Sequence, residues 1–131
     1  MKFSKKKFSR SWIKSKQPRK QRKYRYNAAL HVKQKFMKAH LSKELRKKYN
    51  RRSLGLKKGD KIKIMRGQFK KKTGKIDKVD LKENYVYVTG IDITKKDGTK
   101  TFYPLQPSNL MITELNLDDK KRQKILDRKV K

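Results

Sequence analysis

The sequence predicts a small, mainly β domain, a β-barrel of short strands with flanking helices, within a strongly basic chain. Residues 61–65 alternate charged and apolar side chains, which is the period of a half-buried strand. Residues 85–88 alternate tyrosine and valine, both strand formers. Glycines and prolines punctuate the chain from 59 to 107, as they do between the strands of small barrels.

The charge balance indicates a polyanionic partner. Lys and Arg number 42 against 11 Asp and Glu, which gives a formal net charge of +31, and only 33% of the residues are apolar. Most of these cations need water or an external polyanion, and nucleic acid offers a dense array of phosphates. Because self-repulsion at this charge weakens the isolated fold, we expect parts of the chain to order only when bound.

The same composition argues against several other classes of protein. The chain has no cysteine, so it has no disulfide framework, thiolate metal site or cysteine nucleophile, and this fits a reducing, cytoplasmic setting. No apolar run approaches the roughly 20 residues that span a bilayer, and the N-terminus lacks the apolar core of a secretory signal. A length of 131 residues suits one small domain with extensions.

Residues 1–26 are predicted to be a basic arm that buries too little apolar surface to fold alone. Aromatic residues lie among its cations: Phe3, Phe8, Trp12, Tyr24 and Tyr26. Such an arm could be a solubilising or nuclear-targeting tail, but the interleaved aromatics favour direct RNA contact by base stacking. The arm cations that we expect to bind RNA are Arg19, Lys20, Arg22, Lys23 and Arg25.

Residues 27–56 are predicted to form short helices. Asn27 would cap a first helix starting at Ala28, with an apolar side of Leu30, Val32, Phe36 and Met37 and a basic side of Lys33, Lys35 and Lys38. Ser42 would start a second helix, with Glu44 in its first turn and Leu45 and Tyr49 on one face. The basic faces could be solvated or lie on RNA. The cations expected at RNA here are Arg46, Lys47, Lys48, Arg51 and Arg52.

Residues 57–114 are predicted to be the barrel. Gly59-Asp60 is a turn before the strand at 61–65, a basic loop follows, and the alternation resumes from 75 to 81. Glycines on both sides of the loop allow a sharp bend or a close approach to a partner. The loop residues that we expect to contact RNA are Arg66, Gly67, Lys70, Lys71, Lys72, Gly74 and Lys75.

The rest of the barrel is expected between 84 and 113. Val86 and Val88 should face the core, whereas Tyr85 and Tyr87 should face outward, where they could pack under lysine stems or meet RNA. Asp97-Gly98 is a hairpin turn, and the strand that follows it ends at Pro104. A tight turn at 107–109 then leads into a last strand at 110–113.

Residues 115–131 are predicted to hold a basic C-terminal helix. Asp118 and Asp119 would begin it, and Ile125 and Leu126 are its strong apolar residues. Because these are few, we expect the helix to dock on the barrel or on RNA.

No enzyme signature is found, and no small-molecule substrate is expected. His31 and His40 lack metal-ligand spacing, and Lys72-Thr73-Gly74-Lys75 lacks the order of a phosphate-binding loop. The carboxylates of Asp77, Asp80 and Glu83 lie among lysines and should neutralise them. No cofactor is predicted, and the one ion left open is Mg²⁺ held between such a carboxylate and an RNA phosphate.

The strand–loop–strand stretch resembles the KOW motif, which implies the SH3-like version of the barrel. Lys71 departs from the pattern, because it stands where the family usually has a second loop glycine, so the shape of the loop is in question and its charge is not. The matching residues are Gly59, Asp60, Ile62, Ile64, Arg66, Gly67, Lys70, Thr73, Gly74, Lys75 and Ile76.

A wider pattern is similar to the archaeal and eukaryotic branch of a ribosomal family, universal large-subunit ribosomal protein twenty-four, numbered twenty-six in eukaryotes. The resemblance runs from about residue 17 to the C-terminus. Its residues are Tyr26-Asn27-Ala28, His31, the run 40–54, the barrel end Gln106–Leu110 and the tail 119–129.

This resemblance implies a structural protein of the large ribosomal subunit. Its partners would be the 5′ region of the large rRNA and neighbouring ribosomal proteins, with an early role in subunit assembly near the polypeptide exit. One alternative is a KOW module of a transcription elongation complex, although no second domain accompanies the motif here. Another is a non-specific polycation, which the well-formed β pattern disfavours.

Overall fold

The structure is a computed structural model that describes residues 15–128, so the predictions for Phe3, Phe8 and Trp12 lie outside the described residues. The chain runs through α1 (Pro18–Asn27), α2 (Leu30–Phe36), β1 (Lys38–Leu41), α3 (Lys43–Tyr49), β2 (Ser53–Gly55), β3 (Lys61–Ile64), β4 (Thr73–Asp80), β5 (Tyr85–Val88), β6 (Asp92–Thr94), β7 (Lys100–Phe102), a 3-10 turn η1 (Pro107–Asn109), β8 (Leu110–Glu114) and α4 (Lys120–Asp127).

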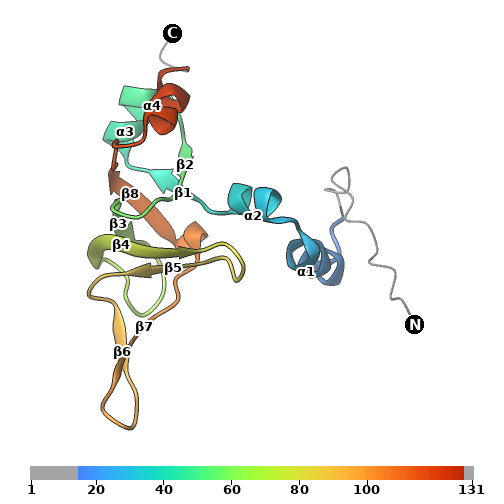
Figure 1. The fold of residues 1–131 in the computed structure, drawn as a ribbon, viewed down its shortest axis with the longest axis vertical. Helices are drawn as coiled ribbons and strands as arrows, with labels where there is room; N and C mark the ends of the chain where they lie inside the picture. The colour runs from blue at the N-terminus through green and yellow to red at the C-terminus, as the bar shows by residue number, and fades with distance from the viewer. Residues whose placement is uncertain (1–14, 129–131) are drawn as a thin grey trace.

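A six-stranded sheet in the order β2-β1-β8-β3-β4-β5 forms the body of the domain, and β6 and β7 form a separate two-stranded sheet. Neighbouring strands are antiparallel except β1 and β8, which pair in parallel through His40–Met111 and Leu41–Ile112. The sheet curves around one core in a small barrel-like domain (Figure 1). The predicted fold class, mainly β with flanking helices, is therefore confirmed.

The period-of-two strands place their apolar residues in the core as predicted. Ile62 and Ile64 in β3 are 0% and 1% exposed, and Val86 and Val88 in β5 are 0% exposed. The two tyrosines of β5 face outward and are half-buried. The ring of Tyr87 lies 5.9 Å from the Nζ of Lys78, which supports packing under a lysine stem as the role of this tyrosine.

The barrel sheet begins earlier in the chain than predicted. We predicted only helices in residues 27–56, but β1 and β2 lie there and pair with each other. The correction has a physical reason, since Lys38–Leu41 alternates exposed and buried residues, with Ala39 2% and Leu41 0% exposed. A helix continued through this segment would turn one of these two side chains away from the core.

The N-terminal arm is helical from residue 18 onward, whereas we predicted no stable structure there. Pro18 occupies the first turn of α1, where its missing N–H costs nothing. Asn27 is the last residue of α1 and not the cap of the next helix, which begins at Leu30 after Ala29. No residue of α1 is buried, and the helix meets α2 through an edge contact between Tyr24 and Phe36 at 6.2 Å.

Helix α2 reverses part of the predicted pattern. Leu30 was predicted on the apolar side of the helix but is 63% exposed. Lys33 was predicted on the basic side but is only 8% exposed. The Nζ of Lys33 donates a hydrogen bond of 2.8 Å to the carbonyl oxygen of Lys82. This contact attaches α2 to the turn between β4 and β5, so this lysine serves the fold.

Helix α3 follows the prediction closely. The hydroxyl of Ser42 accepts a hydrogen bond from the N–H of Leu45, and Tyr49 is buried. Asn50 ends the helix in the left-handed region at φ 47°, a conformation that asparagine tolerates better than most residues. As Figure 1 shows, α3 and α4 lie together at one end of the domain.

The hairpin of β6 and β7 projects from the end of the domain opposite α3 and α4 (Figure 1). We predicted that this segment would complete the barrel, but every residue of both strands is exposed. The predicted turn is present, with Gly98 at φ 81° and the carboxylate of Asp97 accepting from the N–H and the hydroxyl of Thr99. The hydroxyl of Thr99 holds the pKa of Asp97 below its ordinary value.

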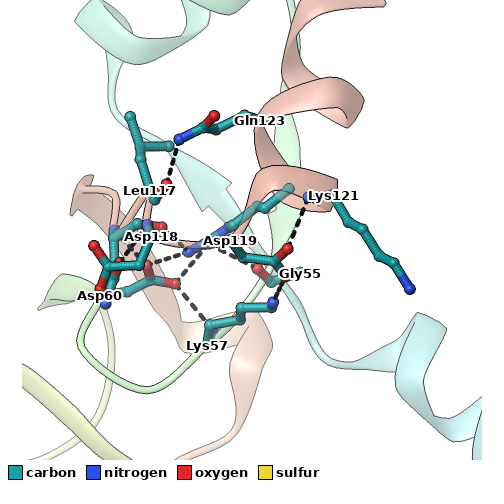
Figure 2. A network of polar contacts seen from close by, with 10 residues as sticks. Gly55, Lys57, Asp60, Leu117, Asp118, Asp119, Lys121 and Gln123 are labelled. Carbon is teal, nitrogen blue, oxygen red and sulfur yellow. Dashed lines mark hydrogen bonds and ion pairs between the residues drawn. The ribbon is translucent and has the colours of Figure 1, made fainter.

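A buried ion pair attaches α4 to the barrel. Asp60 is 0% exposed, and its two carboxylate oxygens accept from the guanidinium of Arg122 at 2.6 and 2.7 Å. The same guanidinium donates to the carbonyl oxygens of Gly55 and Asn116, and the backbone N–H groups of Lys57 and Asn116 donate to Asp60 (Figure 2). The pair is therefore both charge-balanced and surrounded by hydrogen bonds.

The start of α4 is fixed by a second, exposed contact. The carboxylate of Asp119 caps the helix by accepting from the N–H of Lys121, and it pairs with the Nζ of Lys57 (Figure 2). The hydrogen bond from Lys57 lowers the pKa of Asp119. Leu126 is 1% exposed and Ile125 38% exposed, so one of the two predicted apolar residues anchors the helix. Docking on the barrel, one of our two expectations for this helix, is confirmed.

We predict that Arg122→Met destabilises the fold by about 3–5 kcal/mol, because it leaves the Asp60 carboxylate buried without a counter-charge. Urea unfolding at moderate salt measures this change. The control is Lys61→Met, which breaks the exposed pair between Lys61 and Glu114 at 2.7 Å and should cost about 0–1 kcal/mol. Equal effects of the two substitutions would contradict a special role for the buried pair.

Candidate nucleic-acid interface

The predicted RNA-binding cations lie on α1, on α3 and its exit, and on the loop between β3 and β4. Four ion pairs join basic and acidic side chains within residues 15–128, and none of these pairs includes a predicted RNA-binding residue. The predicted cations therefore have no internal carboxylate partner in the described part of the chain. Their charge remains available to a polyanion.

The β3–β4 loop, residues 65–72, is held in shape by its backbone. The N–H of Lys71 donates to the carbonyl of Ile64 at 2.8 Å, and the N–H of Ile64 donates to the carbonyl of Lys72 at 2.9 Å. Gly67 has φ 91° and Lys71 has φ 73°. Lys71 thus adopts the left-handed conformation that a glycine would take, so the unusual residue keeps the shape of the loop and adds a charge to it.

All four cations of this loop, Arg66, Lys70, Lys71 and Lys72, are exposed, and so is Lys75 in the neighbouring strand β4. The Nζ of Lys72 lies 5.2 Å from the ring of Phe69, which itself packs against Tyr103 at 5.0 Å between centroids. These contacts position Lys72 at the base of the loop. A fixed loop with outward cations loses little conformational entropy when it binds phosphates.

Gly74 lies in β4 and has a packing role. A Cβ on this residue would lie 2.6 Å from the Cγ1 of Val88 and 2.8 Å from the carbonyl oxygen of Thr89. Gly74 therefore lets β4 and the end of β5 approach closely. Gly67, in contrast, has no atom within 4 Å of such a Cβ, so its requirement for glycine comes from its positive φ.

The cluster on α3 divides into two sets. The Nε of Arg46 donates to the carbonyl of Leu41, and the NH1 of Arg51 donates to the carbonyl of Ile125, both at 2.7 Å. These two arginines join α3 to β1 and to α4. Lys47 and Arg52 are exposed, and Lys48 is exposed with its Nζ 5.3 Å from the ring of Tyr49. The surface of α3 that can meet a partner is thus centred on its lysines.

The five predicted cations of α1 are exposed, and no residue of this helix is buried. The guanidinium of Arg25 lies 5.3 Å from the ring of Phe36 in α2, which joins this end of the helix to the body. The other predicted cations of this helix, Arg19, Lys20, Arg22 and Lys23, are exposed, and α1 itself lies to one side of the barrel (Figure 1).

The acidic residues near the loop serve the fold. Asp77 pairs with Lys58 at 3.2 Å, and the carboxylate of Asp80 accepts from the N–H groups of Lys82 and Glu83 in the β4–β5 turn. Within residues 15–128, no three His, Cys, Asp or Glu side chains are grouped as metal ligands. Among those same residues, no helix is both long and apolar enough to span a membrane.

Sequence reasoning missed the residues that attach the helices to the barrel. Asp60 was predicted in a turn and Arg122 within the basic C-terminal helix, yet the two form the buried pair. Their separation along the chain leaves no local pattern that would connect them. The single signal was an acid within a basic stretch directly before an alternating strand, which is uncommon in a chain with so few acids.

Comparison with known proteins gives consistent matches over nearly the whole chain. A family model that describes the eukaryotic ribosomal protein L26 and its archaeal counterpart, numbered twenty-four, matches residues 15–129. A relative named large ribosomal subunit protein uL24, from Methanothrix thermoacetophila, is 53% identical over 114 residues, which are 87% of this chain and 98% of that protein. A relative of the same name from Methanosphaera stadtmanae is 49% identical over 116 residues, 88% of this chain and 99% of that one.

We predict that Gly74→Ala destabilises the fold by about 1–3 kcal/mol, because wholly buried Val88 cannot move away from the added methyl group. The control is Gly55→Ala in β2, where the nearest atom to the new Cβ is 4.0 Å away. Thermal unfolding measures both variants. A Gly74→Ala protein that is as stable as Gly55→Ala, but weaker in RNA binding, would assign this glycine to the interface instead.

Proposed function

Because this chain belongs to the family of the eukaryotic ribosomal protein L26 and its archaeal counterpart, we propose that it is a structural rRNA-binding component of the large ribosomal subunit. One observation carries the proposal for RNA binding. The exposed cations of the β3–β4 loop lack acidic partners within residues 15–128 and are held by backbone hydrogen bonds. Membership in a ribosomal family also indicates a structural protein and not an enzyme.

The proposed mechanism is that of an electrostatic clamp. The β3–β4 loop sits on folded rRNA, with lysine ammonium groups and Arg66 on phosphates. Because backbone hydrogen bonds already hold the loop in one shape, ordering it on binding costs little free energy. Contacts of this kind follow the shape of the RNA backbone and carry little information about base sequence.

The helices extend the same action to a wider area. Helix α1 lies to one side of the barrel and α3 lies at one end of it (Figure 1). Both helices carry exposed cations, so the protein can touch separate RNA segments. Neutralising the repulsion between such segments lets them pack together. We place this action in the cytoplasm, on the 5′ region of the large rRNA, early in subunit assembly and near the polypeptide exit, with neighbouring ribosomal proteins as further partners.

We predict that reversing three loop charges together, Lys70→Glu, Lys71→Glu and Lys72→Glu, weakens binding to large-subunit rRNA and flattens its salt dependence. The slope of log affinity against log salt should fall by on the order of one unit for each lost phosphate contact. Filter binding over a series of salt concentrations measures both quantities.

The matched control places the same charge change on the projecting hairpin, as Lys95→Glu, Lys96→Glu and Lys100→Glu. All three lysines are exposed and none is in an ion pair within the described residues. The electrostatic clamp predicts a larger loss of rRNA affinity for the loop variant than for the hairpin variant. Equal losses would show that the protein binds as a non-specific polycation.

The alternative, a KOW module working with RNA polymerase, is separated from this proposal by sedimentation of a cell extract. We predict that the protein migrates with large ribosomal subunits and stays with them at moderate salt. Purification with RNA polymerase, and absence from the subunit fractions, would favour the transcription alternative and contradict the proposal. RNA crosslinking inside intact particles, followed by sequencing, then tests the expected contact with the 5′ region.

A further inference from the structure

Two hollows lie side by side on the outer surface of the barrel, next to the β3–β4 loop. The first, of about 390 Å³, is lined by Arg66 and Gly67 of the loop. The second, of about 200 Å³, is lined by Arg25 of α1 and Lys38 of β1. The two hollows thus lie between the loop cations and the helix cations, which the sequence analysis had placed in separate groups.

Tyr85 and Gln106 line both hollows and form the wall between them. Their position follows from the backbone, because Val86 and Leu105 exchange hydrogen bonds of 2.8 and 2.9 Å and both point into the core. Residues next to them on each strand must point outward. Since the pairing is antiparallel, Tyr85 and Gln106 stand opposite each other on that outer face.

The first hollow combines aromatic rings with free amide groups. Phe69 and Tyr103 both line it, with centroids 5.0 Å apart and planes tilted by 59°. The side-chain amides of Gln68, Gln106 and Asn109 also line it, and none makes a hydrogen bond to another group within residues 15–128. A volume of this size lies in the range of small-ligand pockets. Rings that stack and amides that pair bidentately are the groups that recognise a base.

The second hollow is lined by two cations and by an asparagine with a buried oxygen that has no hydrogen-bond partner within residues 15–128. Asn84 lines it with φ 61°, and its Oδ1 is a buried atom without a hydrogen-bond partner in the described part of the chain. Buried acceptors of this kind normally have a partner, but this oxygen is closed off from solvent, so a bound molecule would meet the cations of the hollow instead. Arg25 and Lys38 supply positive charge, which Glu83 in the same lining partly offsets.

We propose that these hollows bind two successive unpaired nucleotides of RNA, one base in each, with Tyr85 and Gln106 between them. The base in the first hollow lies against the aromatic rings and is recognised by the amides. The nucleotide in the second hollow lies beside the cations Arg25 and Lys38. Arg66 and Arg25 bind the phosphates on either side. This inference rests on the proposed function and adds base recognition to a surface that otherwise follows only shape.

The lining favours RNA over an acidic peptide. A peptide that binds beside a strand uses a row of unpaired backbone groups, whereas the strand groups here are already paired between Val86 and Leu105. Three free amides and three half-buried aromatic rings, Phe69, Tyr85 and Tyr103, offer stacking and edge recognition instead.

The test uses the full-length protein and fluorescently labelled single-stranded oligoadenosine and oligouridine of about ten nucleotides, a length within the usual site size of small RNA-binding domains. Fluorescence anisotropy gives the affinities. Duplex RNA with the same number of phosphates and polyglutamate of matched charge serve as the other two probes. We expect the single strands to bind more tightly than the duplex or polyglutamate. Equal or tighter binding of polyglutamate would overturn the proposal in favour of an acidic peptide.

The decisive comparison is Tyr85→Leu against Tyr87→Leu. Both tyrosines lie on the outer face of β5 and are half-buried, but Tyr87 lines neither hollow. Tyr85→Leu should lower single-strand affinity about tenfold, as loss of one base stack does, with an unchanged salt slope because no phosphate contact is lost. Tyr87→Leu should leave the affinity unchanged. Equal affinities for the two variants would overturn the proposal.

A second variant, Gln106→Ala, keeps the proposal testable if Tyr85→Leu fails to fold, since Gln106 is exposed. It should reduce the difference in affinity between oligoadenosine and oligouridine, and an unchanged difference with unchanged affinities would overturn base recognition. Failure here is distinct from failure of the proposed function. If only base recognition is wrong, the protein still binds rRNA and this binding still depends on Lys70, Lys71 and Lys72. If the proposed function is wrong, the protein does not bind large-subunit rRNA at all.

Discussion

The scarcity of acidic residues is the constraint on which the rest of the structure depends. The chain has 42 Lys and Arg but only 11 Asp and Glu. Few carboxylates are therefore available to form the ion pairs and helix caps that stabilise the fold. Asp60 binds Arg122 in the interior, Asp119 caps α4 and pairs with Lys57, and Asp77 pairs with Lys58. The acids hold the elements of the protein together and leave the proposed RNA-binding cations without carboxylate partners in residues 15–128.

This division separates two kinds of cation that composition cannot distinguish. Lys33, Arg46, Arg51 and Arg122 donate to backbone carbonyls and thereby join the helices to strands, to a turn and to one another. Within residues 15–128, the exposed cations of α1 and of the β3–β4 loop have no such bonds. A basic protein of this size can therefore fold around a core and still present a dense positive surface, because carbonyl oxygens as well as carboxylates accept the hydrogen bonds of its structural cations.

Local patterns predicted several elements, but they missed α1, β1 and β2 and the outward projection of the hairpin of β6 and β7. Alternation identified β3 and β5, and the hydroxyl of Ser42 and the carboxylate of Asp119 cap their helices as expected. The site residues on the β3–β4 loop followed from charge and glycine placement. Nothing local indicated that β1 would pair with β8, that Asp60 would meet Arg122, or that Tyr85 would stand beside Gln106. Those contacts join distant parts of the chain, so they require the whole fold.

The parallel pairing of β1 with β8 has a consequence for the protein during its synthesis. A ribosome releases about 5–20 residues per second, N-terminus first, so the segment that carries α1 emerges seconds before the strand at Leu110–Glu114 exists. Until then β1 lacks β8, one of its two neighbouring strands, and the carboxylate of Asp60 lacks the guanidinium of Arg122. The nascent chain therefore exposes its cationic end to any polyanion before its own interior can close, and shielding during translation must come from outside the molecule.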